Sequence, residues 1–367
     1  MNSKKTPQEL YKIAKEFEKK NKNLIIGDII GVGGYGLVVD IKKPYNSLVG
    51  KLIKKEINDE TNLIYEFKGL NIIKIAKIYT ENILVDKANN KEEKYHLILM
   101  EKAYLKDLKN FNRETYKNGI LKLIIKSPFE GVISDNLIKY YCYEIIKGFE
   151  SLERSDYSHF DIKPDNILIF FNLIMKLSDF SLLRNPNKIK TNNGKIRIPG
   201  GTPGYLSPEY FENSDVSYDV AKKQDYFALG STIYYLKYGE PMLKSPIYEN
   251  DGEKTSDSII DLLQRAMDNI KSKKLSDQDF IDFLCSLINY KPDDRPIFEE
   301  IYRNKWLNKN IDKIMEFYKE NYTNEEKLIM ELNKSDYLIR KKSELNKDRK
   351  KFNFNKNNFK KNNLKKK

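Results

Sequence analysis

The sequence is poor in the residues that build covalent and metal-held frameworks. Its 367 residues include two cysteines, Cys142 and Cys285, and two histidines, His96 and His159. A disulfide framework or a Cys/His metal site is therefore not expected, and a reducing compartment fits the cysteine usage better. No apolar run approaches the ~20 residues of a membrane span, and the first twenty residues are too charged for a signal peptide. The sequence predicts an intracellular protein without a membrane span, cytoplasmic or, alternatively, nuclear.

Apolar and aromatic residues are abundant by contrast. Hydrophobic residues make up 40% of the chain and charged residues 32%, with 18 Phe and 25 Tyr. This composition supports a sizeable core and excludes wholesale disorder. The net charge of +13 gathers at one end, because residues 340–367 hold 13 Lys or Arg against 2 Asp or Glu. We expect a solvated, disordered tail there, and the alternative is contact with a polyanion such as nucleic acid or an acidic membrane.

The hydrophobic pattern changes along the chain from strand-like to helical. Thr6-Pro7-Gln8-Glu9 has the spacing of a capping box and precedes an amphipathic helix, which we expect to pack on the domain that follows. Short strand-like runs lie at 24–30, 37–41, 48–53, 72–79 and 95–100, with a helical stretch near 58–70. Helical periodicity then dominates, at 134–154, 219–238, 256–271 and 277–289. Strands followed by helices predict an α+β protein in two lobes.

A glycine-rich segment, Gly31-Val32-Gly33-Gly34-Tyr35-Gly36-Leu37-Val38, lies between two predicted strands. Glycines let a backbone approach phosphate oxygens and present N–H donors to them. A dinucleotide-binding loop should open a helix, whereas residues 37–41 have a strand pattern. Lys51 follows inside another apolar run. It either points to solvent or, within reach of the glycine loop, pairs with nucleotide phosphates.

The densest polar group is His159-Phe160-Asp161-Ile162-Lys163-Pro164-Asp165-Asn166, followed by Lys176-Leu177-Ser178-Asp179-Phe180-Ser181. Asn166 and Asp179 offer the hard oxygen ligands that suit Mg²⁺ bridging phosphates. With these motifs in order, residues 24 to 307 resemble the catalytic core of eukaryotic protein kinases of the serine/threonine type. The resemblance implies an α+β, two-lobed protein kinase fold, with a small antiparallel sheet lobe carrying one main helix and a larger, mostly helical lobe.

The resemblance also divides the chain. Residues 1–23 would form an extension with the amphipathic helix, and residues 24–307 the kinase domain. Within that domain the small lobe would span 24–100, the hinge 101–105 and the large lobe 106–307. Residues 308–367 would form the basic tail, partly helical and then disordered.

The resemblance implies that the chain transfers the γ-phosphate of ATP to Ser or Thr hydroxyls of protein substrates, with ATP and Mg²⁺ as cofactors. Asp161 would accept the proton of the substrate hydroxyl, and Lys163 would neutralise the transferred phosphoryl group. Lys51 would hold the α/β-phosphates, while Asn166 and Asp179 would hold Mg²⁺. The remaining nucleotide contacts would come from the glycine loop, its valine and the hinge: Gly31, Gly33, Gly34, Gly36, Val38, Glu101 and Ala103.

Further matches lie downstream. Gly201-Thr202-Pro203-Gly204-Tyr205-Leu206-Ser207-Pro208-Glu209 resembles the substrate-docking loop of the family, and Thr202 would bond near Asp161 and Lys163. Asp165 would contribute to substrate choice. Glu209, Arg295 and Asp225 match residues that are structural in the family, since they anchor loops rather than perform chemistry.

The glutamate that pairs with Lys51 has two candidates. Glu60 has apolar residues three, four and seven positions later, which places it on the inward face of the predicted helix. Glu66 lies farther from Lys51 along the chain and is the rival. The pattern favours Glu60.

Three positions depart from the family pattern. Phe160 replaces an arginine that binds an activation-loop phosphate, Ser181 replaces a glycine, and Gly50 stands where a bulky residue is usual. Since none deletes a catalytic group, we expect an active kinase. Phe160 offers no phosphate donor, so activity should not require phosphorylation of Thr191. The alternative is a pseudokinase that binds nucleotide or partners without turnover.

Overall fold

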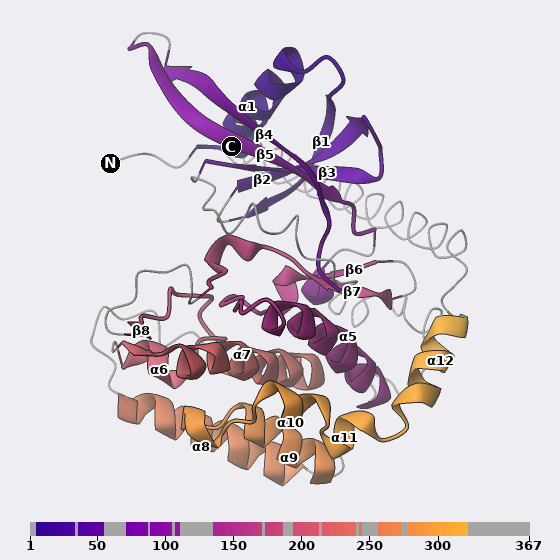
Figure 1. Cartoon of the computed structure of the whole chain (residues 1–367), viewed down its shortest axis with the longest axis vertical. Helices are drawn as coiled ribbons and strands as arrows, with labels where there is room; N and C mark the ends of the chain where they lie inside the picture. The colour runs from indigo at the N-terminus through magenta and orange to yellow at the C-terminus, as the bar shows by residue number, and fades with distance from the viewer. Residues whose placement is uncertain are drawn as a thin grey trace, which may run out of the picture.

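A computed structural model describes residues 5–33, 36–54, 71–86, 89–104, 107–110, 135–170, 173–185, 194–212, 215–239, 242–243, 256–273 and 278–321. The described residues form a sheet-based small lobe above a mostly helical large lobe, joined by the segment that leaves β5 (Figure 1). Among the described helices, none is long and apolar enough to cross a membrane.

The small lobe is built on an antiparallel sheet of five strands in the order β1-β2-β3-β5-β4. The strands are β1 (Ile25–Gly33), β2 (Gly36–Lys43), β3 (Leu48–Ile53), β4 (Ile75–Asp86) and β5 (Lys91–Glu101). In β3, Leu48 and Leu52 belong to the small-lobe core, whereas Lys51 points to the opposite face. The register places Lys51 beside Val38 of β2 and Ile98 of β5.

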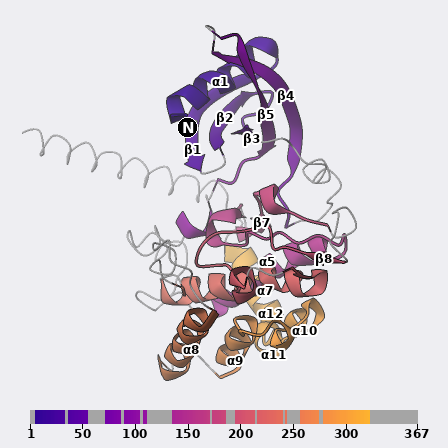
Figure 2. The same cartoon turned by 90° about the vertical axis from the view of Figure 1, so that its left-hand side faces the viewer.

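The amphipathic helix α1 (Pro7–Lys20) covers the sheet face opposite to Lys51, at the end of the molecule farthest from the large lobe (Figures 1 and 2). Thr6 and Glu9 form the expected capping box, and Phe17 and Ala14 are fully buried against the sheet. Polar contacts add to this packing. The Tyr11 hydroxyl donates to the Gly27 carbonyl at 2.8 Å, and the Lys15 ammonium donates to the Ile26 carbonyl at 2.6 Å. The helix is therefore fastened to β1.

Gly50 lies in the same core beneath α1. A Cβ atom there would come within 3.0 Å of Leu97 Cδ1 and 3.1 Å of Ile41 Cδ1. These distances are tighter than ordinary van der Waals contact, so the neighbouring strands fill the space that a bulky residue would take. The absence of a side chain at residue 50 leaves no cavity beside Lys51.

The large lobe is organised around α5 (Asp135–Glu153) and α7 (Tyr218–Tyr238), whose buried faces belong to one apolar cluster. The other helices in the described part of this lobe are α6 (Pro208–Phe211), α8 (Ser256–Lys273), α9 (Gln278–Leu287), α10 (Phe298–Tyr302), α11 (Lys305–Asn308) and α12 (Ile311–Asn321). Two short hairpins, β6 (Ile167–Ile169) with β7 (Met175–Leu177) and β8 (Lys195–Ile196) with β9 (Val216–Ser217), complete it. Turns of 3₁₀ helix occur at Pro164–Asn166, Phe180–Leu182 and Pro292–Asp294.

The two lobes share a buried polar junction. The Asn71 side-chain amide donates to Glu144 Oε2 of α5 and to the Met175 carbonyl of β7, each at 2.8 Å. The Ile73 amide donates to the Leu177 carbonyl at 3.0 Å. The sequence assigns residues 72–79 to a strand, but β4 begins at Ile75. That expectation is wrong at its start, because Ile72 and Ile73 turn their backbone toward β7.

Candidate functional site

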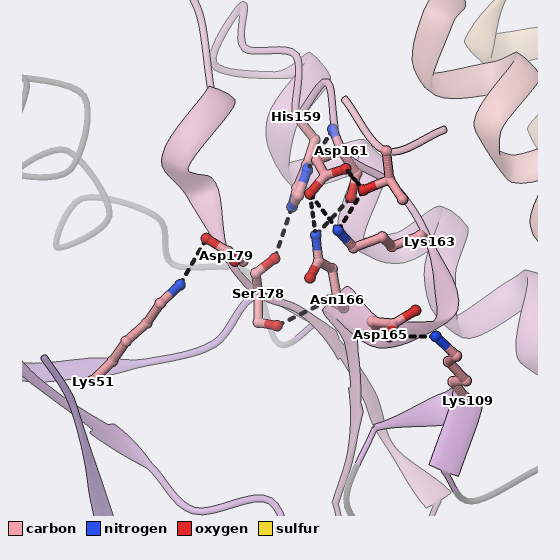
Figure 3. A network of polar contacts seen from close by, with 10 residues as sticks. Lys51, Lys109, His159, Asp161, Lys163, Asp165, Asn166, Ser178 and Asp179 are labelled. Atoms are coloured by element: carbon pink, nitrogen blue, oxygen red, sulfur yellow. Dashed lines mark hydrogen bonds and ion pairs between the residues drawn. The ribbon is translucent and has the colours of Figure 1, made fainter. Parts of the chain in front are cut away.

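The candidate site lies between the lobes, where a polar network centres on Asp161 (Figure 3). Lys163 Nζ contacts Asp161 Oδ2 at 2.8 Å and donates to Thr202 Oγ1 at 2.5 Å. The Thr202 hydroxyl donates to Asp161 Oδ1 at 2.7 Å, and Asn166 Nδ2 donates to Asp161 Oδ2 at 2.9 Å. Four residues that the sequence assigns to one site are thus in direct contact. Together they fix the carboxylate of Asp161 in one orientation.

His159 holds the loop from behind. The Asp161 backbone amide donates to His159 Nδ1 at 3.2 Å, so the ring proton sits on Nε2, which donates to the Ser178 carbonyl at 3.0 Å. Burial lowers the pKa of His159 below its ordinary value, in spite of the nearby Asp161 charge. The Ser178 hydroxyl in turn donates to the Asn166 carbonyl. The strand that leads to Asp179 is thereby joined to the loop that carries Asp161.

Asp225 anchors the start of the same loop. Its carboxylate accepts the backbone amides of His159 at 2.6 Å and Phe160 at 2.8 Å. Burial raises the pKa of Asp225 to about 7, although both amide donors favour the charged form. Phe160 has a φ of 62°, which is uncommon for a residue other than glycine, and the two hydrogen bonds help to hold it there. The position expected for Asp225, as a loop anchor, agrees with these contacts.

Phe160 points away from the polar network into a separate apolar cluster. Its side chain is fully buried with Ile196, Ile198 and Ala221. Leu182, Val216 and Tyr218 pack against that cluster. The cluster therefore joins the loop before Asp161 to β8, β9 and the start of α7, and we call it the Phe160 cluster.

Lys51 reaches across from the small lobe to Asp179 of the large lobe. Its Nζ lies 2.7 Å from Asp179 Oδ1, and both side chains are less than one-fifth exposed. Burial opposes ionisation of Asp179, but the Lys51 charge and hydrogen bond outweigh it and lower the pKa of Asp179. Asp179 has a φ of 62°, followed at once by the turn at Phe180–Leu182. The carboxylate is therefore charged and held by Lys51 of the small lobe.

The donor atoms at this place fit Mg²⁺. Asn166 Nδ2 is engaged by Asp161, which makes Oδ1 of the amide the atom suited to a cation. Lys51 contacts Oδ1 of Asp179, so Oδ2 of that carboxylate can serve as the second hard oxygen. The residues present thus have the ligand chemistry that the ion prefers.

The glycine segment lies where β1 ends and β2 begins. Gly31 pairs with Val38, and Gly33 with Gly36. Gly36 has a φ of 156°, and a Cβ there would lie 2.0 Å from the Leu52 carbonyl oxygen. No side chain can occupy that position. The last residue of β5, Glu101, begins the segment between the lobes, and Ala103 follows two positions later.

Asp165 lies at the outer edge of the network, where its carboxylate pairs with Lys109 at 2.9 Å (Figure 3). Farther away, Arg295 makes two hydrogen bonds to Glu209, at 2.7 and 2.6 Å, and both side chains are buried. A bidentate pair of this kind fixes geometry strongly. It holds the start of α6, close after Thr202, against the large lobe.

Several predicted residues lie outside the described part of the chain. These are Gly34 of the glycine segment, the two candidate partners of Lys51 (Glu60 and Glu66), the predicted phosphorylation position Thr191, and residues 322–367 of the tail. The choice between Glu60 and Glu66 therefore stays a prediction.

Sequence reasoning missed the side chains that fasten the segment after β5. Glu101 contacts Lys176 of β7, and Lys102 contacts Asp40 of β2. A signal was present, since Lys176 and Asp40 each interrupt an apolar strand. A charged residue inside an apolar strand also identifies Lys51, but this pattern does not predict which residue pairs with the charge.

Comparison with known proteins agrees with this geometry. A model of the protein kinase domain family matches residues 24–307, so the chain belongs to the protein kinase family, and its two-lobed fold is confirmed. It is a serine/threonine protein kinase.

An Aurora kinase of Saccharomyces cerevisiae is 29% identical over 290 residues, which cover 78% of this chain and 69% of that protein. Rat serine/threonine-protein kinase MRCK beta is 26% identical over 250 residues, 66% of this chain and 13% of its own length. Human citron Rho-interacting kinase is 32% identical over 175 residues, 47% of this chain and 8% of its own length.

Proposed function

We propose that this kinase transfers the γ-phosphoryl group of ATP to Ser or Thr hydroxyls with Asp161 as the residue that accepts the substrate proton. The observation that carries the proposal is the immobilised carboxylate: Lys163, Thr202 and Asn166 all contact Asp161. A general base works when its acceptor oxygen is aimed at the proton it removes. The three contacts orient the Asp161 carboxylate before any substrate binds.

The second part of the proposal concerns charge. Lys163 would offset negative charge on the transferred group, since its ammonium lies beside Asp161 and is only slightly exposed. Lys51 would hold the α/β-phosphates. Such a role requires its present contact with Asp179 to loosen or be shared.

Protein kinases in general use ATP and Mg²⁺, and the oxygen donors of Asn166 and Asp179 support the same requirement here. Bound Mg²⁺ would neutralise the phosphate oxygens. Nucleotide would lie under the β1–β2 turn, with Gly31, Gly33, Gly34, Gly36 and Val38 around the phosphates and adenine. The backbone of Glu101 and Ala103 would present hydrogen-bonding groups to the base.

The pseudokinase alternative is not favoured. A fold kept only for binding has no need for an oriented Asp161 together with Lys51, Asn166 and Asp179. We propose the same division of the chain as before, with a kinase domain at 24–307, an extension before it and a tail after it. The low cysteine content supports an intracellular and cytoplasmic location.

The test is a transfer assay on the full-length protein with radiolabelled ATP and a degenerate peptide library containing Ser, Thr and Tyr acceptors. We expect label on Ser and Thr, and its loss when Mg²⁺ is chelated and return when Mg²⁺ is restored. Labelling mainly on Tyr would contradict the acceptor class. Nucleotide binding without transfer to any peptide would support the pseudokinase instead.

The charge of the tail supports a separate proposal about partners. Residues 340–367 carry an excess of 11 positive charges, so contact with a polyanion would weaken steeply as salt is added. Deletion of these residues should remove salt-sensitive binding to heparin and leave turnover of a short peptide unchanged. Equal heparin binding by the deleted protein would refute a role for the tail.

A further inference from the structure

Two consecutive residues at the end of β5 carry ion pairs to opposite lobes. Glu101 pairs with the large lobe: its two carboxylate oxygens lie 2.6 and 2.7 Å from Lys176 Nζ. The same carboxylate accepts the Lys74 amide at 2.7 Å, and the Glu101 amide donates back to the Lys74 carbonyl. The side chain and backbone of Glu101 are therefore both fixed.

The lysine on the large-lobe side is well enclosed. Lys176 is 9% exposed, and its ammonium lies 4.5 Å from the centroid of the Phe170 ring. It stands in β7, three residues before Asp179. The side chain of Lys176 is 10% exposed and that of Glu101 is 24% exposed, so salt screens this pair only in part. Loss of Glu101 would leave Lys176 buried without this counter-charge.

The next residue is tied to the small lobe. Lys102 Nζ donates to Asp40 Oδ1 at 2.8 Å, and the Lys102 amide donates to the Ser47 carbonyl at 2.9 Å. Asp40 is 8% exposed and also pairs with Lys42. Burial opposes its ionisation, yet hydrogen bonds from both lysines lower the pKa of Asp40. Asp40 lies in β2, the strand that starts at the last glycine of the loop.

We propose that Lys176 and Asp40 are positioning residues for nucleotide binding: by pairing with Glu101 and Lys102, they hold the hinge backbone between the lobes in its binding geometry. The inference rests on the proposed function, in which the backbone of residues 101–103 contacts adenine. A hinge fixed before nucleotide arrives loses less conformational freedom on binding, so the affinity is higher. The pairs also join the hinge to the strands that lead to Asp179 and from Gly36.

The test compares four single variants of the full-length protein. Lys176→Met removes the ion pair with Glu101, Asp40→Asn removes the pairs with Lys102 and Lys42, and Lys176→Arg keeps the charge. Lys237→Met is the matched control, because Lys237 is also buried, pairs with Asp135 at 2.5 Å and lies 5.8 Å from the centre of the Phe280 ring, far from the hinge. The dissociation constant of Mg²⁺·ADP is measured by titration calorimetry. KM for ATP, kcat and the melting temperature are measured alongside.

We expect Lys176→Met and Asp40→Asn each to weaken ADP binding about three- to tenfold and to raise KM for ATP similarly, with kcat within about twofold of wild type. Lys176→Arg should retain most of the affinity. Lys237→Met should lower the melting temperature without changing ADP affinity, which separates positioning from stability.

Wild-type affinity for ADP in a folded Lys176→Met and a folded Asp40→Asn protein would overturn the inference while leaving the proposed function intact. Tighter binding or faster turnover in either variant would also overturn it, because the pairs would then hold the lobes away from the binding geometry. A wild-type protein that binds no Mg²⁺·ADP would instead defeat the proposed function itself. If Lys176→Met fails to fold, Asp40→Asn gives the decision alone.

Discussion

Phe160 and Asp161 are neighbours in the chain, but their surroundings are opposite. Asp161 lies in a polar network with Lys163, Thr202 and Asn166, in which every contact is a hydrogen bond or ion pair. Phe160 is fully buried in an apolar cluster with residues of β8 and α7. One backbone step thus separates the groups proposed for chemistry from a contact of purely apolar character.

The difference shows which part of a catalytic loop must keep its chemistry and which part needs only to be held. Charge at residue 161 has a direct role in the proposed reaction, so its partners are polar and closely placed. Phe160 joins the loop to the segment around β8, and burial of apolar surface stabilises this contact. The packing supports the prediction that activity does not require an arginine at this position.

The largest effect should come from the polar side. Asp161→Asn keeps the size of the side chain but removes the proton acceptor, so kcat should fall about 10²- to 10⁴-fold. Affinity for Mg²⁺·ADP and the melting temperature should stay near those of wild type. Asp279→Asn, at a surface ion pair with Lys305, is the control and should leave kcat unchanged. Wild-type turnover by Asp161→Asn would show that another group accepts the proton.

The next effect concerns the apolar side. Phe160→Ala removes a fully buried ring and should reduce the free energy of unfolding by about 3 kcal/mol or more. Chemical denaturation measures this loss, and tryptic cleavage after Lys195 or Arg197 should become faster. Phe317→Ala, at a ring that is 49% exposed, should change stability by less than about 0.5 kcal/mol. Equal stability of the two variants would mean that the Phe160 cluster does not hold the segment.

Restoring the family's arginine offers a sharper version of the same comparison. Phe160→Arg would place a charge among the apolar side chains of Ile196, Ile198 and Ala221. Burying an unpaired charge is unfavourable, so this variant should be no more stable than Phe160→Ala. A stable and more active Phe160→Arg protein would show that the cluster can rearrange around a polar group.

A smaller loss of activity is expected at Thr202, which belongs to the polar network but only through its hydroxyl. Thr202→Ala leaves Asp161 and Lys163 in contact and removes the group that bridges them. An increase of about 1–3 kcal/mol in the activation free energy corresponds to roughly a 5- to 150-fold decrease in kcat. Thr202→Ser retains the hydroxyl and should recover most of the rate. If Ser and Ala behave alike, the methyl group and not the hydrogen bonds matters.

The smallest expected effect is a pH dependence of stability caused by His159, which borders the polar network. Burial lowers the pKa of His159 in the folded protein, whereas in the unfolded chain it titrates near 6.5. Below about pH 6.5 the unfolded state therefore binds a proton that the folded state does not. The contribution of His159 to the free energy of unfolding should therefore fall with decreasing pH, with a slope approaching about 1.4 kcal/mol per pH unit. Asp225, whose pKa burial raises to about 7, acts in the opposite direction, but it does so equally in wild type and in a His159 variant. Denaturation of wild type and His159→Gln between pH 7.5 and 5.5 would test this, and equal slopes would refute it.

Local patterns predict much of this architecture because they depend on neighbours in the chain. The helices near 135–153 and 218–238 follow from periodicity, and the capping box of Thr6 and Glu9 follows from spacing. The site residues Asp161, Lys163 and Asn166 are found together because one short loop carries them. Thr202 is found only through the family resemblance, since 41 positions separate it from Asp161.

The remaining features depend on contacts that no local pattern encodes. The extent of β4 to Asp86 is hidden because three polar residues, Thr80, Glu81 and Asn82, interrupt its apolar pattern in the hairpin with β5. The partners of Phe160 come from β8 and α7, and the partner of Lys176 lies 75 positions earlier. The sequence can indicate that a residue such as Phe160 or Lys176 is buried, but only the tertiary structure shows which residue it contacts. The independence from Thr191 phosphorylation stays a prediction.

The packing of helix α1 on the sheet bears on which fragment of this kinase can fold independently. The match to the family begins at residue 24, yet Phe17 and Ala14 seal the core over Leu24 and Ile26. A fragment cut at residue 24 would carry that apolar face into water, where such a face favours association between molecules. Similarity between relatives marks the stretch that they share. The fragment that can fold by itself in solution must instead include every residue that covers the hydrophobic core.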